Sequence, residues 1–274
     1  MPELPEVQTV VDTLKNLIQA KRISNVEVLW DNTIANVPSA IFSKQLIGQS
    51  FHSFLRRGKY LVFQLDDYVL ITHLRMEGKF YYYQERTIPD KHTHVLIHFE
   101  DGSSIHYHDV RKFGKMYLYA SNEEQVVLSN LGKEPWDKEL TCAYLKKKIG
   151  NKKITVKQCL LDQSIITGIG NIYANEILFL AGIHPTKKVD TLSEKNLKDI
   201  IQYTQSVLEL AIQKGGTTVR SYTSSLGVTG KFQLSLLVYQ REGQMCKHCH
   251  SIIEKLVQNG RSSFYCPKCQ KVEA

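Results

Sequence analysis

The chain has 274 residues, and at roughly 100–200 residues per domain this length predicts two domains with a small appendage. It is 42% hydrophobic and 9% aromatic, which excludes a disordered chain because a sizeable core can be buried. A total of 35 Lys and Arg against 27 Asp and Glu gives a formal charge of +8, which favours a polyanionic partner. Because no apolar run has the length of a membrane helix and the first residues do not resemble a signal peptide, we expect a soluble, intracellular protein.

Residues 5–20 are predicted to form one amphipathic helix. Pro5 suits the first turn of such a helix, so Pro2 and Glu3 lie just ahead of its N-terminus, where negative charge is favoured. The apolar residues recur at the three- and four-residue spacings of a single buried face. They are Val7, Val10, Val11, Leu14, Leu17 and Ile18.

From residue 22 to about 119, short β-prone runs alternate with turn-forming residues. Many short strands at regular spacing predict an antiparallel sandwich or barrel. The expected strands are 23–30, 50–56, 60–65, 68–74, 80–84, 94–99, 103–108 and 115–119.

The second half of the chain is predicted to be helical. A lysine-rich helix is expected at 138–149 and a short one at 171–182. Ser193 is a suitable N-cap for a long helix that Gly215 ends. Residues 220–231 are polar and contain glycine, which predicts a mobile loop.

Four cysteines close the chain in two Cys-x-x-Cys pairs, Cys246 with Cys249 and Cys266 with Cys269. Two such pairs at this separation are typical of one tetrahedral Zn²⁺ site. Four thiolates leave no open position on the metal, so the site is predicted to be structural, with the metal stabilising a module too small to fold on its own core. Four free or disulfide-linked cysteines are the alternative.

Basic residues gather near the metal module and in residues 146–157, where six lysines occur. Such clusters make salt-dependent phosphate contacts with little sequence specificity, and a solvated helix face is the alternative. Residues 258–261 are predicted to be a turn between two strands, which would present Arg261 on a rigid tip. A solvated surface charge is the alternative for this arginine.

Five histidines lie in or beside two predicted strands. Strand alternation places His92 with His94, and His106 with His108, on common faces. A second metal site is one interpretation, but no glutamate follows at a ligand position, so packing and phosphate hydrogen bonds are favoured. The fifth histidine is His98.

Gly168-Ile169-Gly170-Asn171 lacks the third glycine and the strand–helix–strand context of a dinucleotide fingerprint. Asn171 is either an ordinary helix N-cap or part of a helix N-terminus that directs backbone N–H groups at a phosphate.

The N-terminus offers a nucleophile. Pro2 follows the initiator Met, which cells normally remove before so small a residue, and this leaves a secondary amine at the chain end. An α-amine is unprotonated near neutral pH far more often than a lysine amine. It can attack a sugar carbon and form an iminium intermediate, with Glu3 as a candidate proton donor.

Eight segments in this order resemble one family over almost the whole chain. They are residues 2–7 (Pro-Glu-Leu-Pro-Glu-Val), 56–60 (Arg-Arg-Gly-Lys-Tyr), 73–76 (His-Leu-Arg-Met), 91–94 (Lys-His-Thr-His), 109–114 (Asp-Val-Arg-Lys-Phe-Gly), 170–173 (Gly-Asn-Ile-Tyr), 214–218 (Lys-Gly-Gly-Thr-Thr), and the four-cysteine module with Gly260-Arg261. The family is bacterial formamidopyrimidine-DNA glycosylase, which repairs oxidised purines in DNA.

The resemblance implies an α+β multidomain fold. An N-terminal antiparallel β-sandwich carrying an N-terminal helix would occupy residues 1–132. A helix–two-turns–helix domain would follow at 133–232, and a zinc-finger β-hairpin at 233–274. The family's activity is excision of 8-oxoguanine and formamidopyrimidines from double-stranded DNA, followed by cleavage of the abasic strand by β,δ-elimination. One structural Zn²⁺, a monomer and a cytoplasmic, nucleoid-associated location would follow.

The resemblance also implies residue roles. Pro2 would attack C1′ of the damaged nucleotide and Glu3 would be the general acid. Lys59 and Arg261 would bind phosphates and assist the eliminations. Further DNA contacts would be His92, Arg111, Lys152, Lys157 and Asn171.

Attack on C1′ of a paired nucleotide is sterically blocked, so the nucleotide must leave the helix. Apolar wedges can fill the resulting hole, and Met76 and Phe113 are the candidates, with core packing as the alternative. Arg111 could hydrogen-bond the orphaned base opposite the lesion.

Three places depart from the family pattern, one of them the run Leu-Gly-Lys-Glu-Pro at 131–135, where the family usually has Leu-Gly-Pro-Glu-Pro. Gln8 stands where Glu is usual, and His250 stands where Gly is usual. The nearest rival is the endonuclease VIII branch, which prefers oxidised pyrimidines, but its start usually has Gly at the position of Leu4. A non-catalytic zinc-ribbon DNA-binding protein would explain charge and metal, although not Pro-Glu at the start of the chain.

Overall fold

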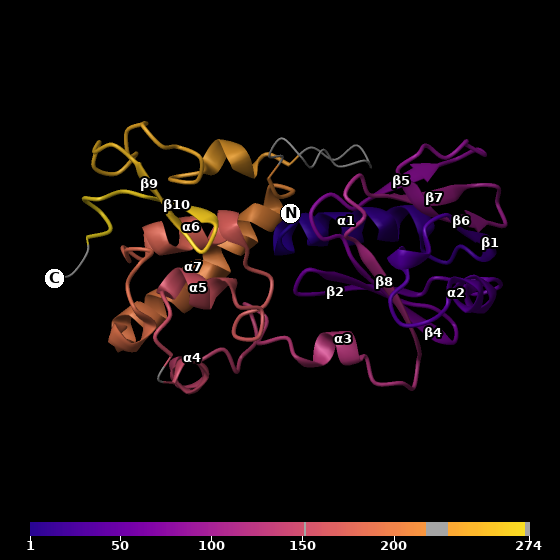
Figure 1. Cartoon of the computed structure of the whole chain (residues 1–274), viewed down its shortest axis with the longest axis horizontal. Helices are drawn as coiled ribbons and strands as arrows, with labels where there is room; N and C mark the ends of the chain where they lie inside the picture. Colours follow the sequence, from indigo (N-terminus) through magenta and orange to yellow (C-terminus); the bar gives the residue numbers. More distant parts are fainter. Residues whose placement is uncertain (151, 218–229, 272–274) are drawn as a thin grey trace. The chain divides into compact units, whose positions relative to one another are not determined.

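The computed structural model describes residues 1–150, 152–217 and 230–271 (Figure 1). The chain divides into two compact units. Unit 1 comprises Met1–Ser129 and Gly215–Lys231, and unit 2 comprises Asn130–Lys214 and Phe232–Ala274. Most of the loop expected at 220–231 lies outside the described residues. Within the described part of the chain, no helix has the length and apolar content needed to cross a membrane.

Unit 1 contains two four-stranded antiparallel sheets, which confirms the predicted sandwich. One sheet has the order β1-β6-β7-β5 and the other β2-β3-β4-β8. All eight predicted strands are present with ends shifted by a few residues. They are β1 (Ile23–Val28), β2 (Ser53–Arg57), β3 (Tyr60–Gln64), β4 (Tyr68–His73), β5 (Lys79–Tyr83), β6 (Thr93–Phe99), β7 (Ser104–His108) and β8 (Lys115–Ala120).

Helix α1 (Leu4–Ile18) packs its apolar face into the core that the two sheets share. Val7, Leu14 and Ile18 are fully buried in the same cluster as Phe63 of β3 and Ile105 of β7. Removing apolar surface from water contributes about 25 cal/mol per Å², so burial of this face stabilises the position of the helix. The residues just before it are thereby fixed as well.

Two short helices of unit 1 were not predicted, α2 (Ser39–Leu46) and α3 (Val126–Ser129). Helix α2 buries only Phe42 and Leu46 and has no side-chain N-cap bond, so one i,i+4 pair is all the periodicity that it offers. The short 3₁₀ turn η1 (Asp31–Thr33) precedes it.

Unit 2 is helical and ends in a β-hairpin. Two helices match prediction closely, α6 (Asn171–Leu180) and α7 (Glu194–Gln213), and the Ser193 side chain caps α7 as expected. Helix α4 (Cys142–Ile149) is shorter than predicted because Thr141 caps it. The remaining elements are α5 (Val156–Leu161), η2 (Val189–Thr191), η3 (Phe232–Ser235), β9 (Glu254–Gln258) and β10 (Arg261–Tyr265).

Helix α6 is buried along nearly its whole length and carries polar side chains into the interior. The Asn175 side chain accepts a 2.7 Å hydrogen bond from the Phe264 backbone N–H in β10. The Glu176 carboxylate accepts three more, from the N–H groups of Leu237, Val238 and Tyr239, at 2.8–3.0 Å. A buried carboxylate is tolerated when its oxygens are fully hydrogen-bonded, so these bonds attach the final module to α6.

We expect Glu176→Ala to lower the free energy of unfolding by roughly 3 kcal/mol, because three N–H groups in a buried or half-buried segment lose their acceptor. Chemical denaturation would measure this. Glu209→Ala is the control, since Glu209 lies on the exposed side of α7 and should change stability by less than about 0.5 kcal/mol. Equal stabilities of the two variants would show that the carboxylate does not hold the module.

Candidate active site and nucleic-acid interface

The first residues of the chain are buried rather than frayed. Pro2 and Glu3 are both buried, and the backbone N–H of Glu3 donates a 2.9 Å hydrogen bond to the carboxylate of Glu6. Chain ends are poorly ordered unless they are tied down. Here the start of α1 and the Glu6 carboxylate hold the Pro2-Glu3 pair at a defined place.

Charged groups surround the start of the chain. Burial lowers the pKa of the Met1 amine below its ordinary value, and the positive charge of Lys59 acts in the same direction. Glu3, Glu6 and Glu77 oppose this shift. The Met1 amine, one residue before Pro2, therefore loses its proton more readily than a fully exposed amine does.

Lys59 lies in the tight turn between β2 and β3. Arg57 pairs with Tyr60 across the hairpin, which leaves Gly58 and Lys59 as a two-residue loop. Gly58 has φ of +58°, a conformation that glycine adopts without strain. Lys59 itself is only 5% exposed, and its ammonium is close enough to affect the chain terminus.

His73 lies near the Lys59 ammonium and is uncharged. It pairs with Tyr60 in the β3–β4 ladder, and the two rings meet edge to face at 4.5 Å. The Arg75 N–H donates to His73 Nδ1 at 2.9 Å, so this nitrogen carries no proton. Burial lowers the pKa of His73 to about 3, with Arg75 and Lys59 adding to the shift.

Glu6 connects the chain start to another segment of unit 1, which sequence reasoning did not foresee. Its Oε1 accepts hydrogen bonds from the Thr217 N–H at 2.7 Å and from the Thr217 hydroxyl at 3.0 Å. Gly216 has φ of +76°, and a Cβ there would lie 2.8 Å from Glu6 Oε1. The Gly-Gly-Thr segment is the one signal in the sequence. Its glycines indicate that another group comes close to this backbone, but they do not identify that group as Glu6.

The described residues on either side of 218–229 lie next to each other. A Cβ on Gly230 would overlap the backbone carbonyls of Gly215 and Gly216. Gly230 therefore lies against Gly215 and Gly216, and Gly216 lies beside the carboxylate of Glu6.

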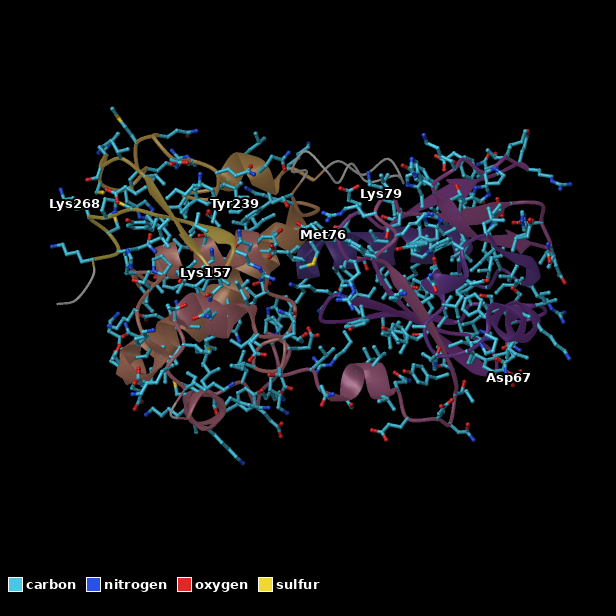
Figure 2. The ribbon with its side chains drawn as sticks, in the orientation of Figure 1. Asp67, Met76, Lys79, Lys157, Tyr239 and Lys268 are labelled. Atoms are coloured by element: carbon cyan, nitrogen blue, oxygen red, sulfur yellow. The ribbon has the colours of Figure 1, made fainter. Side chains whose placement is uncertain are left out.

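The two wedge candidates are exposed, so the alternative of core packing is wrong for both. Met76 is 38% exposed in the turn after β4, and Phe113 is 50% exposed between β7 and β8. Figure 2 labels Met76. The Arg111 guanidinium lies 4.9 Å from the centre of the Phe113 ring, so a cation and an apolar ring share one loop.

The histidines do not form a metal site. His94 is buried, and its Nε2 donates to the Asp109 carbonyl at 2.7 Å. His92 lies instead against His108, with ring centres 5.4 Å apart. Within residues 1–150, 152–217 and 230–271, the one group of side chains arranged for a metal is the cysteine set of unit 2.

The four cysteine sulfurs, from Cys246, Cys249, Cys266 and Cys269, all lie within 4.8 Å of one another. Zn–S bonds of about 2.3 Å in a tetrahedron place the sulfurs about 3.8 Å apart, so the set fits one Zn²⁺. This confirms the predicted metal site. His250, beside the second ligand, has φ of +61°, which explains why glycine suits this position.

Two predicted DNA contacts, Lys157 and Asn171, meet at the hairpin of unit 2. The buried Lys157 ammonium donates to the Ser262 carbonyl at 2.7 Å and to the Ser263 hydroxyl at 2.8 Å. The Asn171 side-chain amide also donates to the Ser262 carbonyl, at 3.2 Å. Asn171 is the first residue of α6 and Gly170 is the N-cap, so the N-cap interpretation of Asn171 is wrong.

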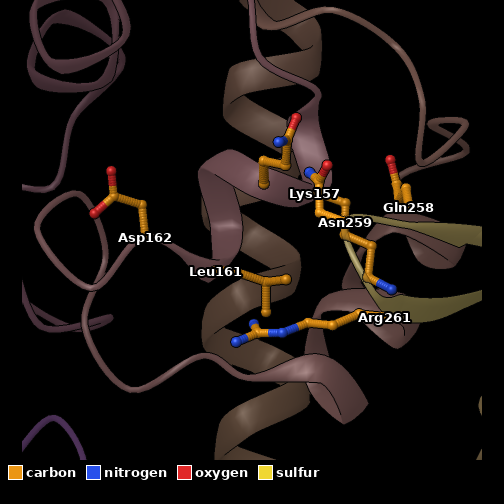
Figure 3. A pocket seen from close by; sticks show the side chains of 7 residues that line it. Lys157, Leu161, Asp162, Gln258, Asn259 and Arg261 are labelled. Carbon is orange, nitrogen blue, oxygen red and sulfur yellow. The ribbon is translucent and has the colours of Figure 1, made fainter.

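Arg261 lies exposed next to this pair of donors. A pocket of about 280 Å³ separates the hairpin turn from α5, and Arg261, Lys157, Leu161 and Asp162 are among its lining residues (Figure 3). In Figure 3 the Arg261 guanidinium lies beside Leu161. Lys152 is also exposed and lies 3.7 Å from the Asp162 carboxylate.

Gln8 retains local hydrogen bonding despite its departure from the family pattern. Its oxygen accepts from Arg56 Nε at 3.0 Å, and its amide donates to Asp12 at 2.9 Å. The exchange of Glu for Gln thus leaves α1 bonded to β2.

We expect His73 to make the protein less stable as pH falls. The unfolded histidine binds its proton near pH 6.5, whereas folded His73 remains neutral down to about pH 3. Between these values the unfolded state holds more protons, so the free energy of unfolding falls by up to about 2 kcal/mol from pH 7 to pH 5. His73→Gln should show a smaller fall in chemical denaturation. Parallel pH profiles would contradict this account.

Three family models match the chain. Residues 1–116 match the formamidopyrimidine-DNA glycosylase N-terminal domain, and residues 131–223 match the H2TH domain of the same family. Residues 243–272 match a zinc finger found in FPG and IleRS.

Curated relatives and solved structures agree. The chain is 45% identical to formamidopyrimidine-DNA glycosylase of Bacillus subtilis, covering 98% of this chain and 99% of that protein, and 46% identical to that of Bacillus licheniformis, covering 99% and 100%. A complex between a Lactococcus lactis FPG mutant and DNA containing Fapy-dG is similar with a TM-score of 0.92 at 36% identity, covering 99% and 100%. A Lactococcus lactis Fpg complex with DNA containing an abasic site has a TM-score of 0.91 at 35% identity, covering 98% and 100%. The chain therefore belongs to the formamidopyrimidine-DNA glycosylase family.

Proposed function

We infer that the protein is a bifunctional DNA glycosylase and abasic-site lyase acting in base-excision repair. It removes 8-oxoguanine and formamidopyrimidines from double-stranded DNA and then cleaves the abasic strand by β,δ-elimination. The observation that carries this conclusion is the buried Pro2-Glu3 start of the chain, held by α1 and Glu6, in a chain that matches the family along its length.

In the proposed reaction, removal of Met1 exposes the Pro2 amine, which attacks C1′ of the damaged nucleotide. The bond between C1′ and the base breaks, Glu3 supplies a proton as the sugar ring opens, and an iminium links Pro2 to the sugar. Loss of a proton from C2′ then expels the 3′-phosphate, and a second elimination expels the 5′-phosphate. Lys59 and Arg261 bind the phosphates as charge develops on them.

The remaining roles concern binding. His92, Lys152 and Asn171 contact the DNA backbone, and such contacts position the duplex without reading its sequence. Lys157 acts near the damaged base, and its bonds to Ser262 and Ser263 also hold the hairpin that carries Arg261. Met76 and Phe113 fill the hole left by the extruded nucleotide.

The division of labour follows the expected domains. We expect residues 1–132 to be the catalytic domain, 133–232 the helical DNA-binding domain and 233–274 the zinc finger. By its contacts, Gly215–Lys231 belongs to unit 1. When bound, Zn²⁺ supplies structural stability through its four thiolates. We expect a monomer that works on the bacterial nucleoid in the cytoplasm.

The free N-terminus should be essential for the covalent step. We expect Pro2→Gly, or a chain extended before Pro2, to lose more than about a hundredfold of the strand-cleavage rate while duplex binding persists. Borohydride trapping on abasic DNA, followed by mass spectrometry, would locate the adduct. Cleavage at full rate by an extended chain would disprove this role, and absence of any adduct would favour a non-catalytic DNA-binding protein.

The zinc site should serve binding rather than chemistry. Cys266→Ala removes one ligand, so the hairpin should unfold and displace Arg261. We expect affinity for damaged and undamaged duplexes alike to fall by at least about tenfold, with a weaker salt dependence. Cys142→Ala, outside the cysteine cluster, is the control. Normal binding by metal-free protein would contradict this role.

Arg111 should confer a preference for the base opposite the lesion. Arginine only donates hydrogen bonds, and the freed edge of cytosine offers two acceptors. We therefore expect faster excision of 8-oxoguanine opposite cytosine than opposite adenine, and Arg111→Ala should reduce the preference with little change in stability. Equal rates opposite both bases in the unmutated protein would remove Arg111 from this role. Faster cleavage of thymine glycol than of 8-oxoguanine would favour the endonuclease VIII specificity.

A further inference from the structure

The loop between β7 and β8 is organised by one buried carboxylate. Asp109 is fully buried. Its Oδ1 accepts a hydrogen bond from the Arg111 N–H at 3.0 Å, and its Oδ2 accepts from the N–H groups of Phe113 and Gly114 at 2.9 and 2.7 Å. These bonds set the backbone of the loop without using the side chains of Arg111 and Phe113.

A second anchor lies at the middle of the loop. Lys112 has φ of +58°, which costs a non-glycine residue conformational energy. Its ammonium lies 3.9 Å from the centre of the Trp30 ring, and a cation–π contact of this kind offsets such a cost. The backbone of Trp30 is itself held, because its backbone N–H donates to the His94 carbonyl at 3.3 Å. The His94 ring in turn donates to the Asp109 carbonyl.

The loop also approaches the turn that carries Met76. A Cβ on Gly114 would overlap the Tyr107 hydroxyl, and so would a Cβ on Gly78, two residues after Met76. Tyr107 is only 1% exposed. The two segments that carry the wedge candidates are therefore both packed against one buried side chain, which fixes their spacing.

Anchors of this kind have a consequence for binding. Ordering a flexible loop and its side chains on a partner costs free energy, and a loop that already has its bound conformation avoids that cost. Arg111 and Phe113 are exposed, yet the Asp109 carboxylate binds the backbone that carries them, and the Trp30 ring contacts the side chain of Lys112 between them.

We propose that Asp109 is a positioning residue, which holds Arg111 and Phe113 in their DNA-binding conformation before DNA arrives, with the Lys112–Trp30 contact as a second anchor. The proposal rests on the function inferred above, in which Arg111 contacts the orphaned base and Phe113 fills the hole. Asp109 itself contacts neither DNA nor the reacting atoms.

Asp109→Asn tests the proposal with little change in shape. Asparagine has one acceptor oxygen in place of two, so at least one of the three loop N–H groups loses its partner. Single-turnover excision of 8-oxoguanine opposite cytosine should slow by about tenfold or more, and the ratio of rates opposite cytosine and adenine should fall toward that of Arg111→Ala. Binding of an undamaged duplex should be unchanged.

The matched control is Asp101→Asn. Asp101 also accepts a backbone hydrogen bond in a turn, from the Ser103 N–H at 3.0 Å, but lies in the β6–β7 turn. The Asp101→Asn variant should leave unchanged both the excision rate and the ratio of rates opposite cytosine and adenine. Loss of the ratio in both variants would show a general effect of weakened turns and would overturn the proposal.

Trp30 provides a readout that is independent of activity. The chain has two tryptophans, so in a Trp136→Phe background Trp30 alone reports. Lys112→Met removes the cation from the Trp30 ring, so the fluorescence emission of this variant is the reference for a loop that has lost the contact. We expect Asp109→Asn to shift the Trp30 fluorescence emission of the DNA-free protein toward that of Lys112→Met. An unchanged emission would show that the loop needs no anchor.

The outcomes separate the proposal from the function on which it rests. If Arg111→Ala loses the opposite-base ratio while Asp109→Asn keeps both the ratio and the emission, the positioning role is wrong and the proposed function stands. If Arg111→Ala keeps the ratio, the role of Arg111 fails, and the emission alone decides whether Asp109 holds the loop. Should Asp109→Asn not fold, Lys112→Met decides, because an unchanged ratio there would overturn the proposal.

Discussion

The chemistry proposed for this protein depends on burying the start of the chain. A reacting amine at a chain end has no flanking residue on one side to hold it, and chain ends fray by default. Here the apolar face of α1 lies in the core of the β-sandwich, and Glu3, Leu4 and Val7 are almost completely buried. Hydrophobic packing of a helix thus supplies the rigidity that catalysis by a chain terminus requires.

The Glu6 carboxylate extends this rigidity to a second segment. One oxygen accepts from Glu3 at the chain start, and the other accepts from Thr217. Because Gly216 leaves no room for a side chain, the contact is close as well as polar. The same carboxylate therefore sets the position of the candidate general acid Glu3 and of Thr217.

Unit 2 uses buried polar groups in a comparable way. Asn175 and Glu176 on α6 bind the backbone of the final module, and Lys157 and Asn171 both donate to one carbonyl, that of Ser262. A hairpin of this size has little core of its own, so metal and hydrogen bonds together determine where Arg261 lies. The cysteines stabilise the fold of the module, while α6 determines its place.

The strands, the two longest helices and the metal site could be predicted from the sequence, because each depends on a repeating or strictly spaced local pattern. Helix α5 could not, since six residues with one capping box carry too little periodicity. The sequence also allowed core packing for Met76 and Phe113. Apolar character alone does not distinguish a core residue from an exposed wedge.

Patterns and spacings along the chain specify most of the helices and strands, the ligands of the zinc and, through motifs in a fixed order, the family. The folded chain was needed to show that Glu6 reaches Thr217, that Lys157 and Asn171 share an acceptor, and that Asp109 accepts hydrogen bonds from a loop near Trp30. Those pairs are separated by up to 211 residues in the chain. Local patterns record which face of an element is buried, whereas the partner of a buried polar group depends on which distant backbone the fold brings beside it.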